Sequence, residues 1–322
     1  MLTAITKQFI MDPPKTPSCH ASSVLPMPDG RVFCAWFGGS REGAADVGIY
    51  LAEKNGSAFD EPRLVASSEE PHWNPVLFRK KDEAVCLFFK NGFSIPDWKT
   101  YVTESTDQGR TWSITRELVP GDDSGGRGPV RNHPIILKSG RILAPASVER
   151  GRWRCFMDIS DDGGLTWRRT GLIEARGYQA FDKEHGRGII QPALWEDEYG
   201  VHALMRSGQG YIYRSDSVDD GRTWREAYPT QLVNNNSGID LTRLEDGTLL
   251  LAHNPVSGNF ASRTPLSLSA SGDGGATRER LLDLETAEGE FSYPSIASEG
   301  NHIFLAYTWQ RKNIVFREFE WR

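Results

Sequence analysis

Residues 160–167 read Ser-Asp-Asp-Gly-Gly-Leu-Thr-Trp, and their pattern, S-x-D-x-G-x-T-W, decides the fold because it recurs along the chain. Ser105–Trp112 and Ser217–Trp224 repeat it, and Ser271–Arg278 repeats it with Arg in place of the final Trp. Successive copies begin 55, 57 and 54 residues apart, a period close to that of β-propeller blades. Four copies at near-constant spacing indicate a repeat architecture.

Each copy has the chemistry of a tight β-hairpin turn. Glycine supplies the positive φ that such a turn needs, and the Asp carboxylate can accept hydrogen bonds from N–H groups of its own loop. The Trp that follows is a large apolar side chain suited to filling the space between neighbouring sheets. We therefore interpret the four copies, called Asp boxes below, as structural staples that mark the blades and carry no chemistry.

A common unit surrounds the boxes: an apolar strand, a turn often holding Asp-Gly, a second strand, a variable loop, a third strand, the box and a fourth strand. Six such units begin near His20, Trp73, Asn132, Ile190, Ser237 and Tyr293. The sixth unit ends after its third strand, and the strand-like segment 3–10 would complete it. We expect an all-β, six-bladed β-propeller, with residues 1–322 as one domain and the ring closed by the N-terminal strand.

The composition fits this fold and limits the partners. The 322 residues include 32 Gly and 10 Trp but no long apolar run, and the formal net charge is −6, so we expect neither a membrane span nor a nucleic-acid partner. Four dispersed cysteines form no C-x-x-C pair, so we expect reduced thiols, no metal and no cofactor. Without a basic segment before an apolar one at its start, the chain is expected to be cytoplasmic; a secreted chain trimmed of its leader would look the same.

Candidate site residues follow from the blade register. In a propeller, the starts of the innermost strands and the ends of the second strands point to one mouth of the central channel. The strand starts hold His20, Asn74, Asn132, His133, Gln191, Asp240 and Tyr293. The ends of the second strands hold Arg41, Lys90, Glu149, Arg206, Asn254 and Arg311, with Asp46 and Arg263 on nearby loops. Several cations around one mouth would bind an anion, such as a carboxylate held bidentately by Arg.

The boxes, the six units and the arginines resemble the sialidase (neuraminidase) superfamily, in its BNR-repeat branch, over essentially the whole chain. The resemblance implies that Arg206 and Arg263 are two of three carboxylate-binding arginines. It implies that Arg41 accompanies Asp46, the acid/base residue of the first blade, and that Tyr293 is the nucleophile or an electrostatic stabiliser. We therefore expect Arg41, Arg206 and Arg263 to form the carboxylate clamp. The resemblance also implies an acidic oligosaccharide or glycoconjugate as partner and exo-sialidase-like hydrolysis as activity.

Two positions depart from the pattern of the superfamily. His20 stands where the first carboxylate-binding Arg is expected, and Gln191 stands where a Glu would deprotonate the nucleophilic Tyr. A neutral amide cannot act as a base toward a phenol, whose reference pKa is about 10. The retaining sialidase mechanism therefore lacks two of its parts at these positions.

Two other functions remain open. The first is a lyase that eliminates beside a glucuronate, as at a rhamnose–glucuronate linkage; cations would neutralise the carboxylate, and His20, His133 or Tyr293 would serve as base and acid. Arg41, Lys90, Arg206 and Arg263 are the cations available for it. The second is a non-catalytic propeller that binds acidic glycans, which would need no general acid.

Overall fold

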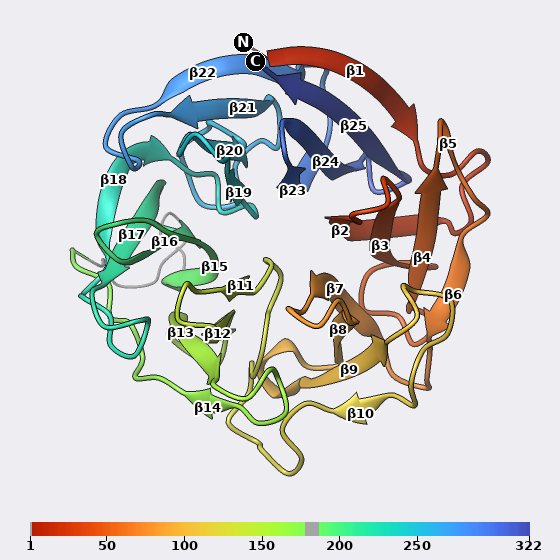
Figure 1. Cartoon of the computed structure of the whole chain (residues 1–322), viewed down its shortest axis with the longest axis horizontal. Helices are drawn as coiled ribbons and strands as arrows, with labels where there is room; N and C mark the ends of the chain where they lie inside the picture. The colour runs from red at the N-terminus through yellow and green to blue at the C-terminus, as the bar shows by residue number, and fades with distance from the viewer. Residues whose placement is uncertain (1, 178–186) are drawn as a thin grey trace. The chain divides into compact units, whose positions relative to one another are not determined.

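The computed structural model describes residues 2–177 and 187–322, and within them the chain forms twenty-five strands and one short 3-10 turn. The strands assemble into six antiparallel sheets, so the fold is the predicted six-bladed β-propeller (Figure 1). In these two ranges no helix is long and apolar enough to cross a membrane. The chain divides into two compact units, described in turn below.

The first unit comprises Met1–Leu77, Ser237–Pro255 and Ser262–Arg322. Its strands of the first blade are β2 (Ser18–Pro26), β3 (Val32–Gly39), β4 (Gly48–Asn55), β5 (Ala58–Phe59) and β6 (Arg63–Ala66). Those of the fifth blade are β19 (Asp240–Arg243), β20 (Leu249–His253), β21 (Leu266–Ser271) and β22 (Glu279–Glu285). The sixth blade is β23 (Phe291–Glu299), β24 (His302–Trp309), β25 (Asn313–Trp321) and β1 (Leu2–Phe9).

The second unit comprises Phe78–Asn236 and Val256–Ala261. The second blade is β7 (His72–Arg79), which starts in the first unit, β8 (Val85–Asn91), β9 (Lys99–Ser105) and β10 (Arg116–Glu117), with the 3-10 turn at Ile95–Asp97. The third blade is β11 (Ile135–Ile136), β12 (Ile142–Val148), β13 (Arg154–Ser160) and β14 (Arg168–Arg169). The fourth is β15 (Ile189–Glu196), β16 (Val201–Ser207), β17 (Tyr211–Ser217) and β18 (Tyr228–Val233).

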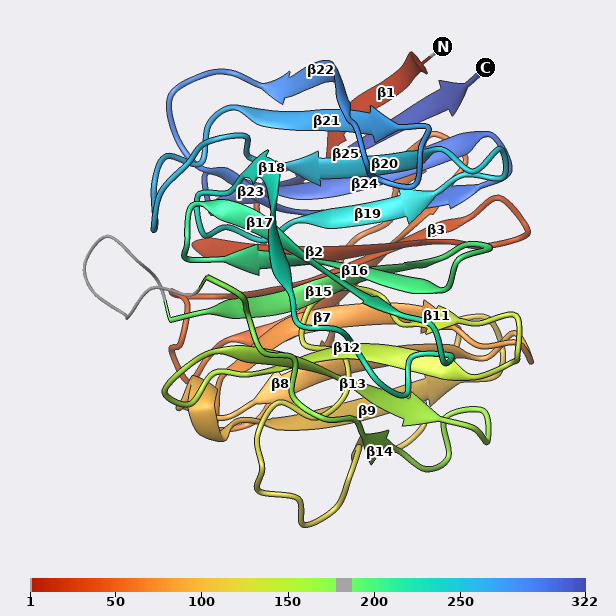
Figure 2. The same ribbon diagram turned by 90° about the vertical axis from the view of Figure 1, so that its left-hand side faces the viewer.

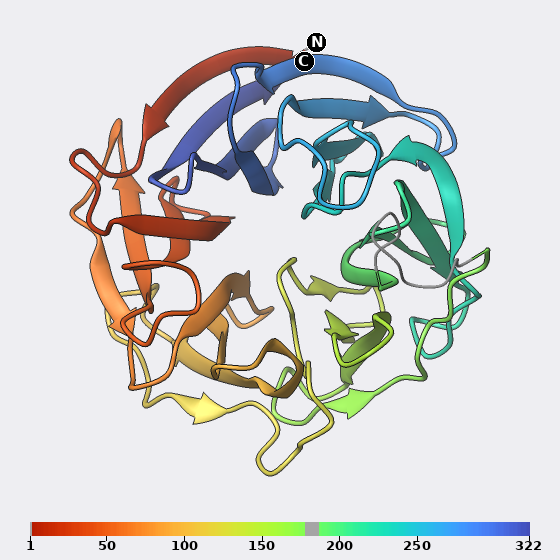
Figure 3. The ribbon, with the colours of Figure 1, turned by 180° about the vertical axis from the view of Figure 1, so that it is seen from behind.

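The N-terminal strand closes the sixth blade, as predicted. β1 pairs antiparallel with β25, with Leu2 opposite Trp321 and Phe9 opposite Val315. The two strands and both chain ends lie side by side when the molecule is viewed from the side and from behind (Figures 2 and 3). The Lys7 ammonium forms a 2.7 Å ion pair with Glu285 at the end of β22, so β1 also contacts the fifth blade.

All four Asp boxes form the hairpin turn that their sequence predicts. In the central box the Asp162 carboxylate accepts hydrogen bonds from Ser160 Oγ at 2.7 Å and from the Thr166 N–H at 2.9 Å. The same two bonds, at 2.8 and 2.8 Å, 2.8 and 2.9 Å, and 2.7 and 2.9 Å, recur in the other copies at Asp107, Asp219 and Asp273. The boxes are therefore local turns held by their own side chains.

Two of the three box tryptophans of the second unit, Trp167 and Trp224, pack between blades. The Trp167 ring meets the Phe88 ring of the second blade edge to face, with centroids 6.3 Å apart. Trp224 packs against a buried cluster that includes Leu143 and Met157 of the third blade and Met205 of the fourth. Each indole N–H also donates to a box glycine, Trp167 to Gly164 O at 3.2 Å and Trp224 to Gly221 O at 3.0 Å.

The third blade differs from the prediction at its first strand, which is only the two-residue β11 and does not start at Asn132. The preceding loop occupies the edge of β12 instead, because the Val130 N–H donates to Pro145 O at 3.0 Å. Gly126 lies so close to Ser147 O that a Cβ there would be 1.9 Å from it. Backbone of this loop thus replaces the missing part of the strand.

Candidate functional site

Three predicted site residues share a strained backbone at the start of an innermost strand. Asn74, Gln191 and Tyr293 have φ of 42°, 55° and 52°, and each precedes a proline. Positive φ is uncommon for residues with a side chain, and a following proline restricts the backbone further. At Gln191 and Tyr293 the strand pairing shifts register, which marks a β-bulge. Strain of this kind concentrates at functional sites, so the bulges single out these residues.

In the first blade the bulge carries Ala21, with φ of 56°, and His20 directly precedes it. The His20 ring packs on the Tyr293 ring at a centroid distance of 4.2 Å and a tilt of 47°. His20 Nδ1 lies 2.8 Å from Thr308 Oγ1, which also accepts the Ala21 N–H at 3.2 Å. His20 is buried and Tyr293 is half-buried. The structure therefore brings together two of the predicted catalytic residues of the first unit.

Two predicted arginines, Arg263 and Arg311, bind the same carboxylate, that of Glu290, which the sequence analysis did not identify. Arg263 NH1 donates to Glu290 Oε1 at 2.6 Å, and Arg311 Nε donates to the same oxygen at 2.9 Å. The Arg263 guanidinium carbon lies 5.5 Å from the centre of the Tyr293 ring. Although burial raises the pKa of Glu290, the charges of Arg263 and Arg311 hold it below its usual value.

The charges of the two arginines are balanced by two carboxylates. Arg311 forms a second ion pair with Glu42, on the loop between β3 and β4. Two guanidinium groups thus face two carboxylates, Glu42 and Glu290. Glu290 lies three residues before Tyr293, so an acidic residue beside the strand start was the signal available in the sequence.

Asp46 and Arg41 lie on the same loop of the first blade, outside any strand. The two Asp46 carboxylate oxygens accept hydrogen bonds from the Ser40 hydroxyl at 2.8 Å and from the Ser40 N–H at 2.9 Å. Asp46 therefore closes the loop 40–46, and both Asp46 and Arg41 are exposed.

In the second unit the predicted residues Arg206 and Gln191 are in contact. Arg206 NH1 donates to Gln191 Oε1 at 3.3 Å, and Arg206 Nε donates to Asn236 Oδ1 at 2.8 Å. Burial raises the pKa of Glu149 above its usual value, and the charges of Arg206 and Lys90, which lower this pKa, offset only part of the effect. Glu149 was placed at a strand end from the sequence but was given no role.

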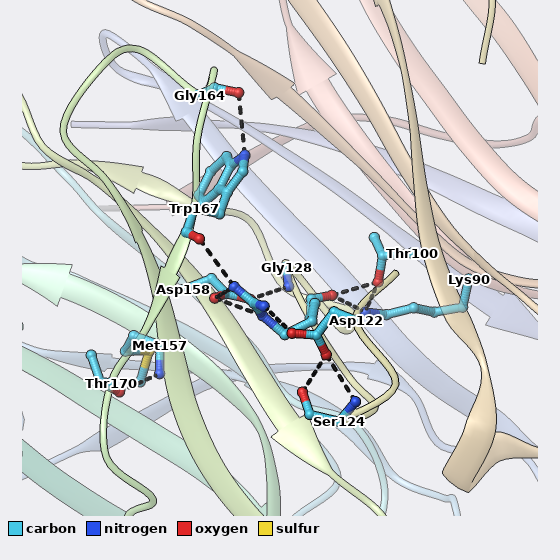
Figure 4. A network of polar contacts seen from close by, with 11 residues as sticks. Lys90, Thr100, Asp122, Ser124, Gly128, Met157, Asp158, Gly164, Trp167 and Thr170 are labelled. Carbon is cyan, nitrogen blue, oxygen red and sulfur yellow. Dashed lines mark hydrogen bonds and ion pairs between the residues drawn. The ribbon is translucent and has the colours of Figure 1, made fainter. Parts of the chain in front are cut away.

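Lys90 lies inside a polar network and not at the surface. Its ammonium is fully buried and donates to Thr100 Oγ1 and to Arg127 O, both at 2.6 Å (Figure 4). Burial lowers the pKa of Lys90 to about 7. Arg127 in turn donates through Nε to Asp158 at 3.0 Å, so these contacts of Lys90 hold the loop that leads to the third blade. This loop continues to Asn132, which is buried, and His133, which is half-buried.

A model of the family described as BNR repeat-like domain matches residues 30–305. No curated protein matches the chain. Over residues 2–177 and 187–322, no group of three or more His, Cys, Asp or Glu side chains is arranged to hold a metal ion.

Solved structures show the same fold at low sequence identity. A protein of unknown function from Dyadobacter fermentans has a TM-score of 0.79 at 19% identity, with 100% of this chain and 99% of that chain covered. Trypanosoma rangeli sialidase, solved with the inhibitor DANA, has a TM-score of 0.71 at 15% identity, covering 94% of this chain. The NanB sialidase of Streptococcus pneumoniae has a TM-score of 0.73 at 13% identity, with 97% of this chain and 70% of that chain covered.

The match to the Trypanosoma enzyme covers 55% of that enzyme, so the chain corresponds to about half of its length. At these identities the likeness concerns the fold, whereas the family match spans most of the chain. The chain belongs to the BNR repeat-like domain family and has the propeller fold of the sialidase superfamily.

Proposed function

We propose that the protein is a glycan-active enzyme that binds a terminal carboxylated sugar and hydrolyses its glycosidic bond in the manner of an exo-sialidase. One observation carries the proposal: a strained, half-buried Tyr293 has both the His20 ring and the Arg263 guanidinium close to its own ring. A backbone position strained in this way, beside an imidazole and a cation, is found most often at functional sites. The imidazole and the cation beside the ring support the proposal that its phenol reacts.

Arg263 and Arg311 are the carboxylate-binding groups of this proposal. Their guanidinium groups converge on Glu290 Oε1, and both side chains are partly exposed. A sugar carboxylate approaching them would accept charge-assisted hydrogen bonds from their remaining N–H groups. Glu290 would keep the two guanidinium groups in place before the ligand arrives.

The chemical step uses Tyr293 as nucleophile and His20 as its base, because the amide at Gln191 cannot take a proton. The Tyr293 hydroxyl gives its proton to the His20 imidazole while the phenol oxygen forms a bond to the anomeric carbon. The bond from that carbon to the leaving oxygen breaks, and Asp46 gives this oxygen a proton. Water then attacks the anomeric carbon and gives a proton to Asp46 while the bond from that carbon to the Tyr293 oxygen breaks. The His20 imidazolium returns its proton to the Tyr293 oxygen, so all three side chains regain their starting forms.

A second candidate, elimination beside a glucuronate, is favoured by the same ring contact between His20 and Tyr293. Here His20 would remove the proton from C5 of the uronate, and Tyr293 would give its hydroxyl proton to the leaving oxygen at C4. The C4–O bond breaks and a C4–C5 double bond forms. The arginines would offset the charge that develops on the carboxylate.

One experiment separates these functions. The protein is incubated with a fluorogenic sialoside and with a set of uronate-containing oligosaccharides, and products are followed by mass and by ultraviolet absorbance. Hydrolysis adds the mass of water and gives no new absorbance, whereas elimination gives an absorbing, unsaturated uronate. Saturable binding without product would show a glycan-binding protein and would contradict both enzymatic proposals.

Variants connect any activity to the site. Tyr293→Phe removes the reacting hydroxyl and is expected to abolish turnover while the ring contact with His20 is kept. Tyr211→Phe is the matched control, since Tyr211 is an exposed tyrosine at the start of β17. Equal activity of Tyr293→Phe and the wild type would remove Tyr293 from the mechanism.

A further inference from the structure

Asn254 follows β20 directly and is fully buried in the first unit. Its amide nitrogen lies within hydrogen-bond distance of three main-chain carbonyl oxygens: Arg263 O at 3.0 Å, Pro265 O at 2.9 Å and Phe291 O at 2.9 Å. The amide oxygen accepts no hydrogen bond from any residue that the structure describes. Donation from the nitrogen is therefore the polar function of this side chain, and the three carbonyls fix the orientation of the amide.

These carbonyls belong to the two segments that carry the proposed site. One is that of Arg263 itself, and another is that of Phe291, which lies two residues before Tyr293. The Phe291 N–H also donates to Arg263 O at 3.1 Å, so the Arg263 segment is joined to the start of β23 at one point. Asn254 occupies this junction.

Beyond the junction, both side chains extend to the same place. The Arg263 guanidinium carbon lies 5.5 Å from the Tyr293 ring centre, and Glu290 holds Arg263 NH1 at 2.6 Å. A shift of the Arg263 main chain against β23 would change this spacing directly. Small displacements of groups that hold a substrate are costly, with a misplacement of about 1 Å reducing rates by about 100-fold.

We propose that Asn254 is a positioning residue that sets the spacing between Arg263 and Tyr293 and thereby the affinity for a sugar carboxylate. The proposal deepens the proposed function and rests on it for its ligand. Asparagine suits the position because alanine and serine cannot span the three carbonyls, and aspartate would place a charge against them.

The test compares Asn254→Ala with Asn313→Ala. Asn313 is a second buried asparagine of the first unit, and its amide donates to Met11 O at 2.7 Å and accepts the Ile314 N–H at 2.8 Å. Both variants lose main-chain hydrogen bonds, so similar losses of thermal stability are expected. Only Asn254→Ala should raise KM for a fluorogenic sialoside and Kd for free sialic acid, each by at least about tenfold.

A second measurement needs no ligand. Hydrogen exchange of the Phe291 amide, which is bonded to Arg263 O, should accelerate at least tenfold in Asn254→Ala and stay unchanged in Asn313→Ala. If both variants change binding and exchange to the same extent, Asn254 is merely structural and the proposal is overturned. If the wild type neither binds nor hydrolyses sialosides while the exchange result holds, the proposed function fails but the positioning role stands.

Discussion

The His20 and Tyr293 rings lie 4.2 Å apart although 273 residues separate them in the chain, and each residue lies at a bulge near the start of its strand, β2 or β23. Thr308, from the neighbouring strand β24, holds the imidazole through Nδ1. The ring therefore has a fixed orientation toward the tyrosine. This relationship underlies the proposed chemistry and gives the first prediction.

Replacing His20 with Gln should reduce kcat/KM by at least about 100-fold, because general base catalysis contributes that much. The acid limb of the pH–rate profile should disappear together with the imidazole, since histidine is the side chain that titrates near neutral pH. Thr308→Val should lower the rate less and keep the limb, because it removes only the partner of Nδ1. An unchanged acid limb in His20→Gln would rule out His20 as the base.

Glu290→Gln should tighten the binding of free sialic acid by about three- to tenfold at low salt. The amide keeps an oxygen for Arg263 and Arg311 but no longer offsets their charge, so the local potential for an anion rises. The gain should shrink as ionic strength rises, because exposed charges are screened. Calorimetric titration at two salt concentrations measures both effects.

Glu290→Ala is the companion variant, since it removes the charge together with the oxygen that holds both guanidinium groups. Weaker binding is expected from the alanine and tighter binding from the glutamine. If both variants bind more weakly to the same degree, the carboxylate charge does not control affinity.

Much of the fold could be predicted because its signals are local. Ser160, Asp162 and Thr166 lie within seven residues and satisfy one another, so the box is legible in the sequence and fixes the blade register. That register placed Gln191 and Tyr293 at strand starts, where the structure has its bulges. The X-Pro pairs at both positions were visible, but proline alone does not predict a positive φ.

The parts that could not be predicted depend on contacts between distant residues. Glu290 meets Arg263 from 27 residues away, and no pattern marks either as a partner of the other. Lys90 has the same strand-end position as Arg206, yet it turns inward to Arg127 O because a loop of the third blade covers it. Strand register predicts the position of a side chain, but it does not predict which loop residues contact that side chain.

The hydrogen bonds of Asp162 should make the stability of the fold depend on pH in the acid range. Hydrogen bonds from Thr166 and Ser160 lower the pKa of its carboxyl from 3.8 to about 2. A carboxyl group whose pKa is lower in the folded than in the unfolded chain stabilises the fold at pH values above its unfolded pKa. This stabilisation is lost as the pH falls through the folded pKa. Asp162→Asn should therefore lower Tm at neutral pH, and its difference from the wild type should vanish between about pH 4 and pH 2.

The control for this loss is Asp220→Asn in the neighbouring box, where the aspartate occupies a variable position and its side chain is 43% exposed. Its Tm should follow that of the wild type from neutral pH to pH 2. A constant difference between Asp162→Asn and the wild type over the whole range would show that the carboxylate charge is not what holds the turn.

His202 in the fourth blade should give the stability of the fold the opposite dependence on pH. Its two ring nitrogens lie 2.6 Å from Asp216 and 2.9 Å from Asp197, so both can donate only when the imidazole is protonated. Burial lowers the pKa of His202, but the hydrogen bonds to the two carboxylates outweigh it and hold the pKa above 6.5. A histidine whose pKa is higher in the folded than in the unfolded chain stabilises the fold fully at pH values below its unfolded pKa. This stabilisation is lost as the pH rises through the folded pKa.

His202→Gln should therefore cost about 1–3 kcal/mol of unfolding free energy at pH 6, as expected when a buried charged partner is lost. The cost should shrink as the pH rises above the folded pKa, because the wild type loses the same interaction there. His302→Gln is the control, since His302 is 45% exposed and pairs with Glu318 at 3.1 Å, where solvent weakens the interaction. Denaturant unfolding from pH 6 to pH 9 measures the difference, and a cost for His202→Gln that does not change with pH would show that the imidazole is neutral in the fold.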